Sequence, residues 1–276
     1  MNSLKFSWLE AGFCFHPHKI TFNTASLNKR KYSSFFGIFR HPSFGVILYD
    51  TGYTDDFHHA TTKVPEKLYA LATPVVCEGE GNCLFQLKNK NIHPDEVKIV
   101  IISHFHADHV CGLKHFKNAK FYFEESSLKY LQNLSRWRQV SKGFLNQLIP
   151  DDIFSRMVNF TSLKRVSLPI SLKPYEFGYD LLNDSSLLAV PLPGHMKGHM
   201  GLYFKYEGRE IFIVADAVWH TESIRSTVLP SKLAKIPMDN WKTYARELNR
   251  LNELYRKNKD IVFLPSHCEE GRGLFK

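Results

Sequence analysis

The segment Ser103–Gly112 constrains this chain more than any other, because it gathers metal-binding side chains within one short loop. It reads Ser-His-Phe-His-Ala-Asp-His-Val-Cys-Gly and supplies His104, His106, Asp108 and His109. Imidazole nitrogens and carboxylate oxygens suit zinc, manganese or iron(II). A single tetrahedral ion cannot easily take four ligands from so short a loop. The spacing therefore favours two ions that share the loop.

A buried strand is predicted directly before this loop. Residues 97–102 are apolar and β-branched apart from Lys98, and the histidines begin where this run ends. A lone histidine more often belongs to the core or the surface. Three histidines and an aspartate at the end of one rigid strand favour metal chemistry instead.

Three further apolar runs end in the same way. Residues 187–192 precede His195, residues 211–214 precede Asp216, and residues 261–264 precede His267. The Pro-Gly pair before His195 predicts a tight turn that orients the imidazole. Repetition of this placement favours a metal-binding role for all three side chains over a structural one.

Composition narrows the class of protein. A chain of 276 residues with 43% apolar content can bury one large core, so we expect a single domain over residues 1–276. No apolar run is long enough to insert into a membrane, and Met1–Lys19 lacks the features of a signal peptide. Five scattered cysteines without a Cys-x-x-Cys pair indicate reduced thiols. We therefore expect a cytoplasmic protein.

The net charge of +9 raises the question of a nucleic-acid partner. The 36 Lys and Arg residues are spread along the whole chain, which favours a solvated basic surface over a nucleic-acid groove. We expect a small-molecule substrate, and no feature of the sequence indicates an oligomeric state.

Apolar periodicity predicts an alternation of strands and helices. Strands are expected at 4–15, 45–49, 97–102, 119–123, 164–168, 187–192, 201–206, 210–214 and 260–264, and helices at 64–72, after His109, and at 125–134. Another helix should follow Asp239 as its N-cap. Residues 137–163 are interpreted as helical with loops, and they are a candidate lid. Two runs of strands, each closed by helices, predict an α/β fold of two facing sheets with helices outside.

Together these motifs resemble those of the metallo-β-lactamase superfamily of binuclear metallohydrolases. The matching residues are Ser103-His-x-His-x-Asp-His-x-x-Gly112, Pro193-Gly-His-x-x-Gly-His199, Asp216, His267 and Asp50-Thr51-Gly52. The resemblance implies a four-layer αββα sandwich of two mixed sheets. It also implies a pair of zinc ions, with manganese, iron or cobalt as alternative metals. One ion would be held by His104, His106 and His195 and the other by Asp108, His109 and His267, with Asp216 bridging both.

Roles for several side chains also follow from the resemblance. A hydroxide shared by the two ions would attack a carbonyl group, and Asp108 would carry the proton to the leaving group. Asp50 would support the ligands from behind, although Asp-Thr-Gly is equally ordinary turn chemistry. His199 is expected to be a structural partner of its turn and not a ligand.

Within the superfamily, the ligand set is most similar to that of the quorum-quenching N-acyl homoserine lactonases. β-Lactamases of this fold carry Cys where Asp216 stands, which argues against penicillin hydrolysis. The lactonases commonly place a Tyr three residues after the bridging aspartate, whereas this chain has Trp219, whose N–H donates a hydrogen bond but has no acidic proton. The resemblance implies hydrolysis of a lactone or ester, with Trp219, Phe105, Phe35 and Phe36 as candidate walls of an acyl pocket.

Three alternatives stay open. A phosphodiesterase or nuclease would use the same ions on a phosphate centre and would bind nucleic acid in a salt-sensitive way. A thioester or aryl-ester hydrolase would show no preference for homoserine lactones. A non-catalytic metal protein would bind zinc without turnover.

Overall fold

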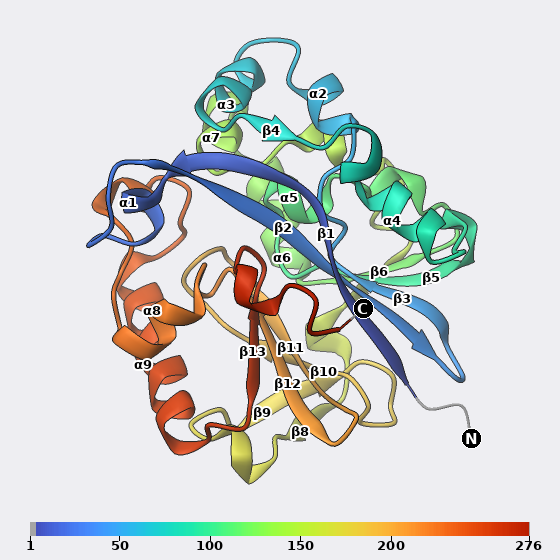
Figure 1. Cartoon of the computed structure of the whole chain (residues 1–276). Coiled ribbons are helices and arrows are strands. Elements are labelled where there is room, and N and C mark those ends of the chain that lie inside the picture. Colours follow the sequence, from blue (N-terminus) through green and yellow to red (C-terminus); the bar gives the residue numbers. More distant parts are fainter. Residues whose placement is uncertain (1–3, 276) are drawn as a thin grey trace.

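Two β-sheets face each other in the computed structural model, which describes residues 4–275 (Figure 1). The larger sheet has the strand order β4-β1-β2-β3-β5-β6-β7, and the smaller has the order β13-β12-β11-β10-β9-β8. The strands are β1 Lys5–Pro17, β2 Lys29–His41, β3 Gly45–Tyr49, β4 Val75–Val76, β5 Val97–Ile101, β6 Lys120–Phe123, β7 Met157–Asn159, β8 Arg165–Ser167, β9 Phe177–Asp180, β10 Leu188–Pro191, β11 Met200–Tyr206, β12 Arg209–Ala215 and β13 Val262–Pro265. Both sheets contain parallel and antiparallel pairs, as predicted.

Aromatic side chains fill the space between the sheets. Phe6 of β1 and Phe39 of β2 stack with their ring centroids 4.8 Å apart, and Phe204 of β11 meets the two rings edge-on at 4.7 and 4.9 Å. All three side chains are buried. Burial of one such ring stabilises the fold by about 1.5–3 kcal/mol. The two sheets are therefore held together by a shared apolar core.

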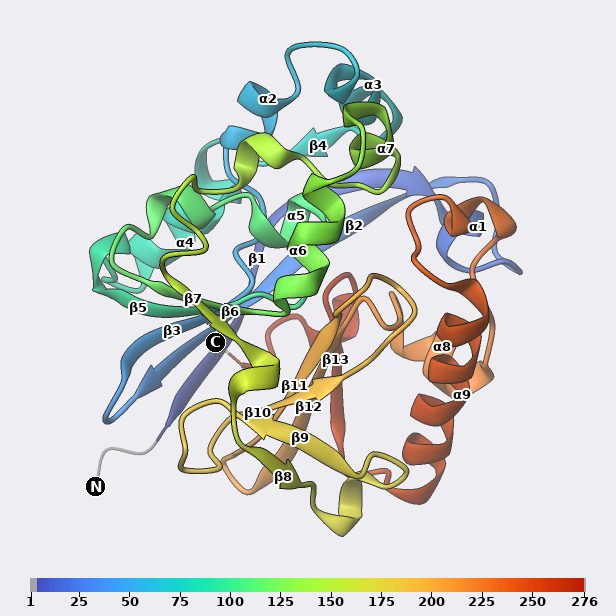
Figure 2. The ribbon, with the colours of Figure 1, turned by 180° about the vertical axis from the view of Figure 1, so that it is seen from behind.

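Helices cover the outer faces of the sheets (Figure 2). They are α1 His18–Thr21, α2 Asp56–Ala60, α3 Glu66–Ala72, α4 Cys83–Asn89, α5 Ala107–Val110, α6 Glu125–Gln132, α7 Arg136–Ser141, α8 Thr221–Ser226 and α9 Trp241–Lys257. Three-residue spacing places Leu248, Leu251 and Leu254 of α9 on one face, which packs against Phe212 and Val214 of β12. Among the described residues, no helix has the length and apolar character needed to cross a membrane.

Strand β2 was missed by the sequence interpretation. It begins with Lys29-Arg30-Lys31, which resembles an exposed loop. The next eight residues are all hydrophobic, small or hydroxylic, and they show no alternation. All residues from Tyr32 to Phe39 are buried, because β2 lies between β1 and β3 and is covered on both faces. A strand buried on both faces shows no period-two pattern. The short strands β4, β7 and β9 were missed as well.

The segment 137–163 is not mainly helical, which corrects the prediction. Only its first residues belong to α7, and they are followed by short 3-10 turns and by β7, which pairs with β6. The N-cap of α9 is Asn240 and not Asp239. The Asn240 side chain accepts a hydrogen bond from the backbone N–H of Thr243 at 2.9 Å, which satisfies one donor of the first turn.

The strands direct the predicted ligands to one end of the sandwich. In the smaller sheet β12 is parallel to β13, and β10 is antiparallel to β11, which is antiparallel to β12. Strands β10, β12 and β13 therefore run the same way, and His195, Asp216 and His267 all follow their carboxyl ends. The loop after β5 brings the other four predicted ligands from the larger sheet.

Candidate metal centre

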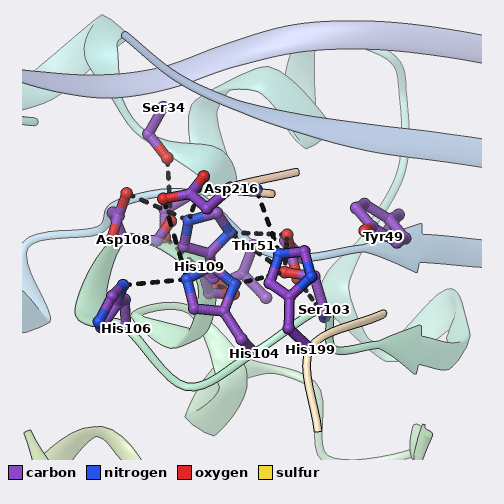
Figure 3. Close-up of polar contacts among 12 residues, drawn as sticks. Ser34, Tyr49, Thr51, Ser103, His104, His106, Asp108, His109, His199 and Asp216 are labelled. Carbon is purple, nitrogen blue, oxygen red and sulfur yellow. Dashed lines mark hydrogen bonds and ion pairs between the residues drawn. The ribbon is translucent and has the colours of Figure 1, made fainter. Parts of the chain in front are cut away.

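The structure brings the seven predicted ligands together as two groups of donor atoms. The first consists of His104, His106, His195 and Asp216, and the second of Asp108, His109 and His267. In each group the donor atoms lie within 4.8 Å of one another, and all seven residues are buried. Four segments distant in the sequence thus converge on one site. Figure 3 shows two of them, the loop that carries His104 to His109 and the turn that carries Asp216.

In the first group, imidazole nitrogens converge on one point. His106 Nδ1 lies 3.0 Å from both His104 Nε2 and His195 Nε2. The Asp216 Oδ2 atom lies 3.3 Å from His195 Nε2 and 4.0 Å from His104 Nε2. Ligands at about 2.0–2.2 Å from a tetrahedral ion stand roughly 3.3–3.6 Å apart, so this spacing fits one shared cation.

In the second group, Asp108 Oδ2 lies 3.3 Å from His109 Nε2 and 3.2 Å from His267 Nε2. Asp216 reaches this group too, with Oδ1 at 3.5 Å from His109 Nε2 and Oδ2 at 3.3 Å from His267 Nε2. Within residues 4–275, Asp216 is therefore the side chain whose oxygens contact histidines of both groups.

Unpaired atoms in the site fit a pair of cations. His109 Nε2 and Asp216 Oδ1 are buried and have no hydrogen-bond partner among the described residues. Buried polar atoms are normally satisfied, because an unpaired one costs about 1–3 kcal/mol. A cation between these atoms would satisfy both, and the nitrogen and oxygen donors are those that zinc accepts.

Hydrogen bonds behind the ligands fix their orientation. His109 Nδ1 donates to Asp50 Oδ2 at 2.7 Å, and His267 Nδ1 donates to the backbone carbonyl of Ser33 at 2.7 Å. Asp50 also accepts from the N–H and the hydroxyl of Ser103, each at 2.7 Å. When Nδ1 carries the proton, the lone pair of Nε2 points into the site. Asp50 thus contacts a proposed ligand directly, beyond the role of an ordinary turn residue.

Backbone strain accompanies this arrangement at two strand ends. Asp50, directly after β3, has a φ of 58°, and Ala215, directly before Asp216, has a φ of 45°. Residues other than glycine rarely adopt this left-handed conformation, which tends to persist at functional sites. Each of the two turns positions a carboxylate of the site.

Burial and neighbouring charges set the protonation of the histidines. Burial, followed by repulsion from His195, lowers the pKa of His106 to about 3. Burial, followed by His109, also lowers the pKa of His104. Burial disfavours the charged form of His267, but the charges and hydrogen bonds of Asp216 and Asp108 together outweigh burial and raise the pKa of His267 to about 10. Since metals bind neutral imidazole, a cation in the second group has to displace a proton from His267.

His199 and Gly143 complete the surroundings of the first group. His199 Nε2 accepts a hydrogen bond from the backbone N–H of Asp216 at 3.2 Å, so it supports a ligand, as expected. Gly143 was missed by the sequence interpretation. A Cβ atom there would lie 2.7 Å from His106 Cδ2, so only glycine allows the His106 ring its position.

Gly143→Ala is expected to displace His106 and to lower the metal content of the purified protein, as measured by elemental analysis. Gly208→Ala is the matched control, because Gly208 has a φ of 74°, close to the 66° of Gly143, but open space around its Cβ position. Equal metal loss in both variants would mean that backbone strain, and not the contact with His106, causes the effect.

A cavity of about 330 Å³ opens onto both groups. Five of the proposed ligands reach its wall: His106, Asp108, His195, Asp216 and His267. Trp219 lines it too, and the indole Nε1–H donates to Asp216 Oδ2 at 2.8 Å. His16 and Tyr32 of β1 and β2 also face this cavity, and nothing in their local sequence sets them apart.

The prediction that Phe105 walls the pocket is wrong. Its side chain is 1% exposed and packs edge-on against Phe123 and Phe144. Phe35 and Phe36 are buried in the same core cluster, where Phe35 stacks on Trp8. Apolar side chains from other segments form the wall instead: Ile20, Ala72, Val140, Leu233, Ala234 and Ile236.

A family model described as the metallo-beta-lactamase superfamily matches residues 42–257. The chain belongs to this superfamily. The matched range contains six of the seven converging side chains, and only His267 lies beyond it. The mixed two-sheet sandwich with outer helices is the metallo-β-lactamase fold, as predicted.

Two curated superfamily members show which group this chain is similar to. The N-acyl homoserine lactonase AttM of Azorhizobium caulinodans is 27% identical over 162 residues, which cover 58% of this chain and 56% of the relative. AttM of Rhizobium radiobacter is 25% identical over 204 residues, covering 74% and 70%. The chain thus aligns with little more than half the length of the first relative.

Solved structures of superfamily members share the fold along nearly the whole chain. A quorum-quenching N-acyl homoserine lactone hydrolase has a TM-score of 0.72 at 18% identity, covering 99% of this chain and 96% of the other. The dizinc quorum-quenching lactonase AidC, in complex with a product, has a TM-score of 0.67 at 14% identity, covering 97% of this chain and 88% of the other.

Proposed function

We propose that this chain is a dinuclear metal-dependent hydrolase that opens N-acyl homoserine lactones. The observation that carries the proposal is the pair of donor groups sharing Asp216 at the wall of a cavity with apolar sides. The similarity to curated N-acyl homoserine lactonases supports the substrate class. The shared core between the sheets supports one domain over residues 1–276, and five unpaired cysteines support a cytoplasmic location.

Two zinc ions fit the donor set. His104, His106 and His195 would hold one ion, Asp108, His109 and His267 the other, and Asp216 both. When bound, such a pair supplies Lewis acidity, which makes water acidic at neutral pH and polarises an ester carbonyl. The protein keeps these ligands in place through the hydrogen bonds of Asp50, Ser33 and His199.

Asp108 is positioned to carry the proton. Its contacts with His109 and His267 use Oδ2, while the residue also lines the cavity. The second oxygen, Oδ1, is then free to take a proton from water and to pass it to the alkoxide that leaves when the ring opens. The hydrogen bond from Ser34 Oγ to the backbone carbonyl of Asp108, at 2.9 Å, holds this residue in place.

Trp219 takes a different role from the lactonase tyrosine. Its indole N–H donates to Asp216 Oδ2, so it orients a ligand and does not supply a proton. The ring also forms part of the cavity wall beside Leu233, Ala234 and Ile236. This apolar side suits the acyl chain of the substrate, while the ligand side receives the lactone ring.

The substrate class is tested by pH-stat assays of the purified, zinc-loaded protein. The panel contains N-acyl homoserine lactones, aryl esters, thioesters and bis-p-nitrophenyl phosphate. We expect the highest kcat/KM on the lactones. A higher kcat/KM on the phosphodiester would assign the site to phosphate chemistry, and equal values on all carbon esters would assign it to a general esterase.

Trp219→Phe is expected to lower kcat about tenfold while the cavity keeps its apolar wall. The change removes only the hydrogen bond to Asp216, and loss of such an outer partner costs about 10–100-fold in metal affinity or activity. Trp241→Phe is the control, because Trp241 stacks on Tyr244 and makes no contact with the ligands. An unchanged kcat in Trp219→Phe would contradict this role.

A further inference from the structure

Three segments at the cavity mouth expose an unusual number of large apolar side chains. They are residues 63–72 around α3, 136–142 of and after α7, and 229–238, and together we call them the rim. The described part of the chain exposes thirteen large hydrophobic residues, and six of them lie on the rim, which holds only a tenth of the chain: Val64, Leu68, Leu71, Trp137, Leu233 and Ile236. Leu71, Trp137, Leu233 and Ile236 are each at least 60% exposed. Exposed apolar side chains that gather on neighbouring segments in this way are typical of an interaction site.

The rim also carries most of the net charge of the protein. It contains seven bases: Lys63, Lys67, Arg136, Arg138, Lys142, Lys232 and Lys235. Its one acid is Glu66, which is buried and paired with Arg136 at 2.6 Å. Apolar and basic side chains are thus interleaved on the same surface.

The three segments are tied together around the opening of the cavity. The Glu66–Arg136 ion pair joins α3 to α7, and Lys142 Nζ donates to the backbone carbonyls of Ile236 and Met238. All three segments contribute side chains to the cavity wall, such as Tyr69, Val140 and Leu233. Figures 1 and 2 both show α3 and α7 together at one end of the molecule.

We infer that the rim docks this protein on an anionic lipid surface, with the mouth of the cavity facing the lipid. An anionic lipid surface has an acyl region below a layer of phosphate groups. The apolar side chains of the rim would enter the acyl region, and its lysines and arginines would bind the phosphate groups. An acylated substrate partitions into lipid, and a docked cavity would receive it directly. Docking on lipid does not require that the protein hydrolyse a substrate, so it is tested separately from the proposed function.

Other occupants fit the rim less well. A second copy of the chain would bring two surfaces of the same strong positive charge into contact, which is unfavourable. Single-stranded nucleic acid is bound by basic grooves with stacking aromatic rings. The exposed apolar residues of the rim are aliphatic except for Trp137.

Cosedimentation with vesicles tests this docking. The full-length protein is mixed with vesicles of phosphatidylcholine alone or of phosphatidylcholine with phosphatidylserine. We expect strong binding to the phosphatidylserine vesicles, weak binding to the others, and a loss of binding as salt is added. No binding to phosphatidylserine vesicles at low salt would overturn the inference.

Two variants on the rim separate the apolar and the electrostatic contributions. Leu71→Ser with Trp137→Ser should weaken binding to both kinds of vesicle. Lys67→Gln with Arg138→Gln should weaken binding to phosphatidylserine vesicles alone, by about fivefold for each base. None of these four side chains is among those that line the cavity, so soluble substrate should be hydrolysed as by the unmodified protein.

Ile170→Ser is the matched control. Ile170 is 77% exposed and lies three residues after the end of β8, a strand that Figure 2 shows at the opposite end of the molecule from α3 and α7. The Ile170→Ser variant should bind both kinds of vesicle as the unmodified protein does. The inference is wrong if this variant loses binding as much as the rim variants, if Trp137→Ser converts a dimer to a monomer, or if the protein prefers an oligonucleotide to the vesicles.

Discussion

Asp216→Ala is expected to leave fewer than two metal ions per chain and to reduce lactone hydrolysis below detection. The carboxylate oxygens of Asp216 lie 3.3–3.5 Å from the Nε2 atoms of three histidines, and these histidines belong to both donor groups. The removal of Asp216 takes away the side chain that, among the residues described, these two groups share. Elemental analysis of the purified variant, combined with the pH-stat assay, measures metal content and activity on the same sample.

Asp239→Ala is the control for that experiment. Asp239 is exposed and lies outside both donor groups, although its backbone N–H is bonded to the carbonyl of His195. This variant should keep its metal and its activity. Full turnover in Asp216→Ala would refute the ligand assignment as a whole, whatever the substrate proves to be.

Asp50→Asn is expected to lower activity about 10–100-fold and to destabilise the fold by about 1–3 kcal/mol. Asp50 accepts three hydrogen bonds, from His109 and twice from Ser103, and an amide nitrogen cannot accept one. Asparagine tolerates the positive φ of this position, so the backbone should keep its path. Thermal unfolding and metal content are the two measurements.

Asp180→Asn is the matched control for Asp50→Asn. Asp180 is also a buried carboxylate that accepts hydrogen bonds, from Leu182 and Ser185 at the end of β9. This variant should lose stability but keep its metal. If both variants lost stability and neither lost metal, the role of Asp50 would be confined to folding.

The ligands could be predicted from the sequence because each follows an apolar strand. The strands before His104, His195, Asp216 and His267 are short apolar runs that can be recognised in the local sequence, and the spacing of the first motif is specific. The walls of the cavity could not be predicted in this way. Phe105 lies between two predicted ligands, yet its ring turns into the core, because neighbouring residues of one short loop point in different directions.

Long-range contacts explain the other differences. Gly143 matters because the loop after α7 crosses the ring of His106, a meeting of segments far apart in the chain. β2 lacks alternation because its residues from Tyr32 to Phe39 are buried on both faces of the sheet, and this burial depends on parts of the chain that are distant in the sequence. The cap of α9 differs by one residue, since Asp and Asn are both good caps and only the geometry of the turn decides between them.

The two sheets contribute to the centre separately: the loop after β5 in one sheet carries four of the seven donors, and strands of the other sheet deliver the remaining three. Cations bound there would link the two sheets of the sandwich to each other. A cell starved of metal would then accumulate a looser, protease-sensitive form of this protein, and supply of the ions would govern its abundance as much as its turnover.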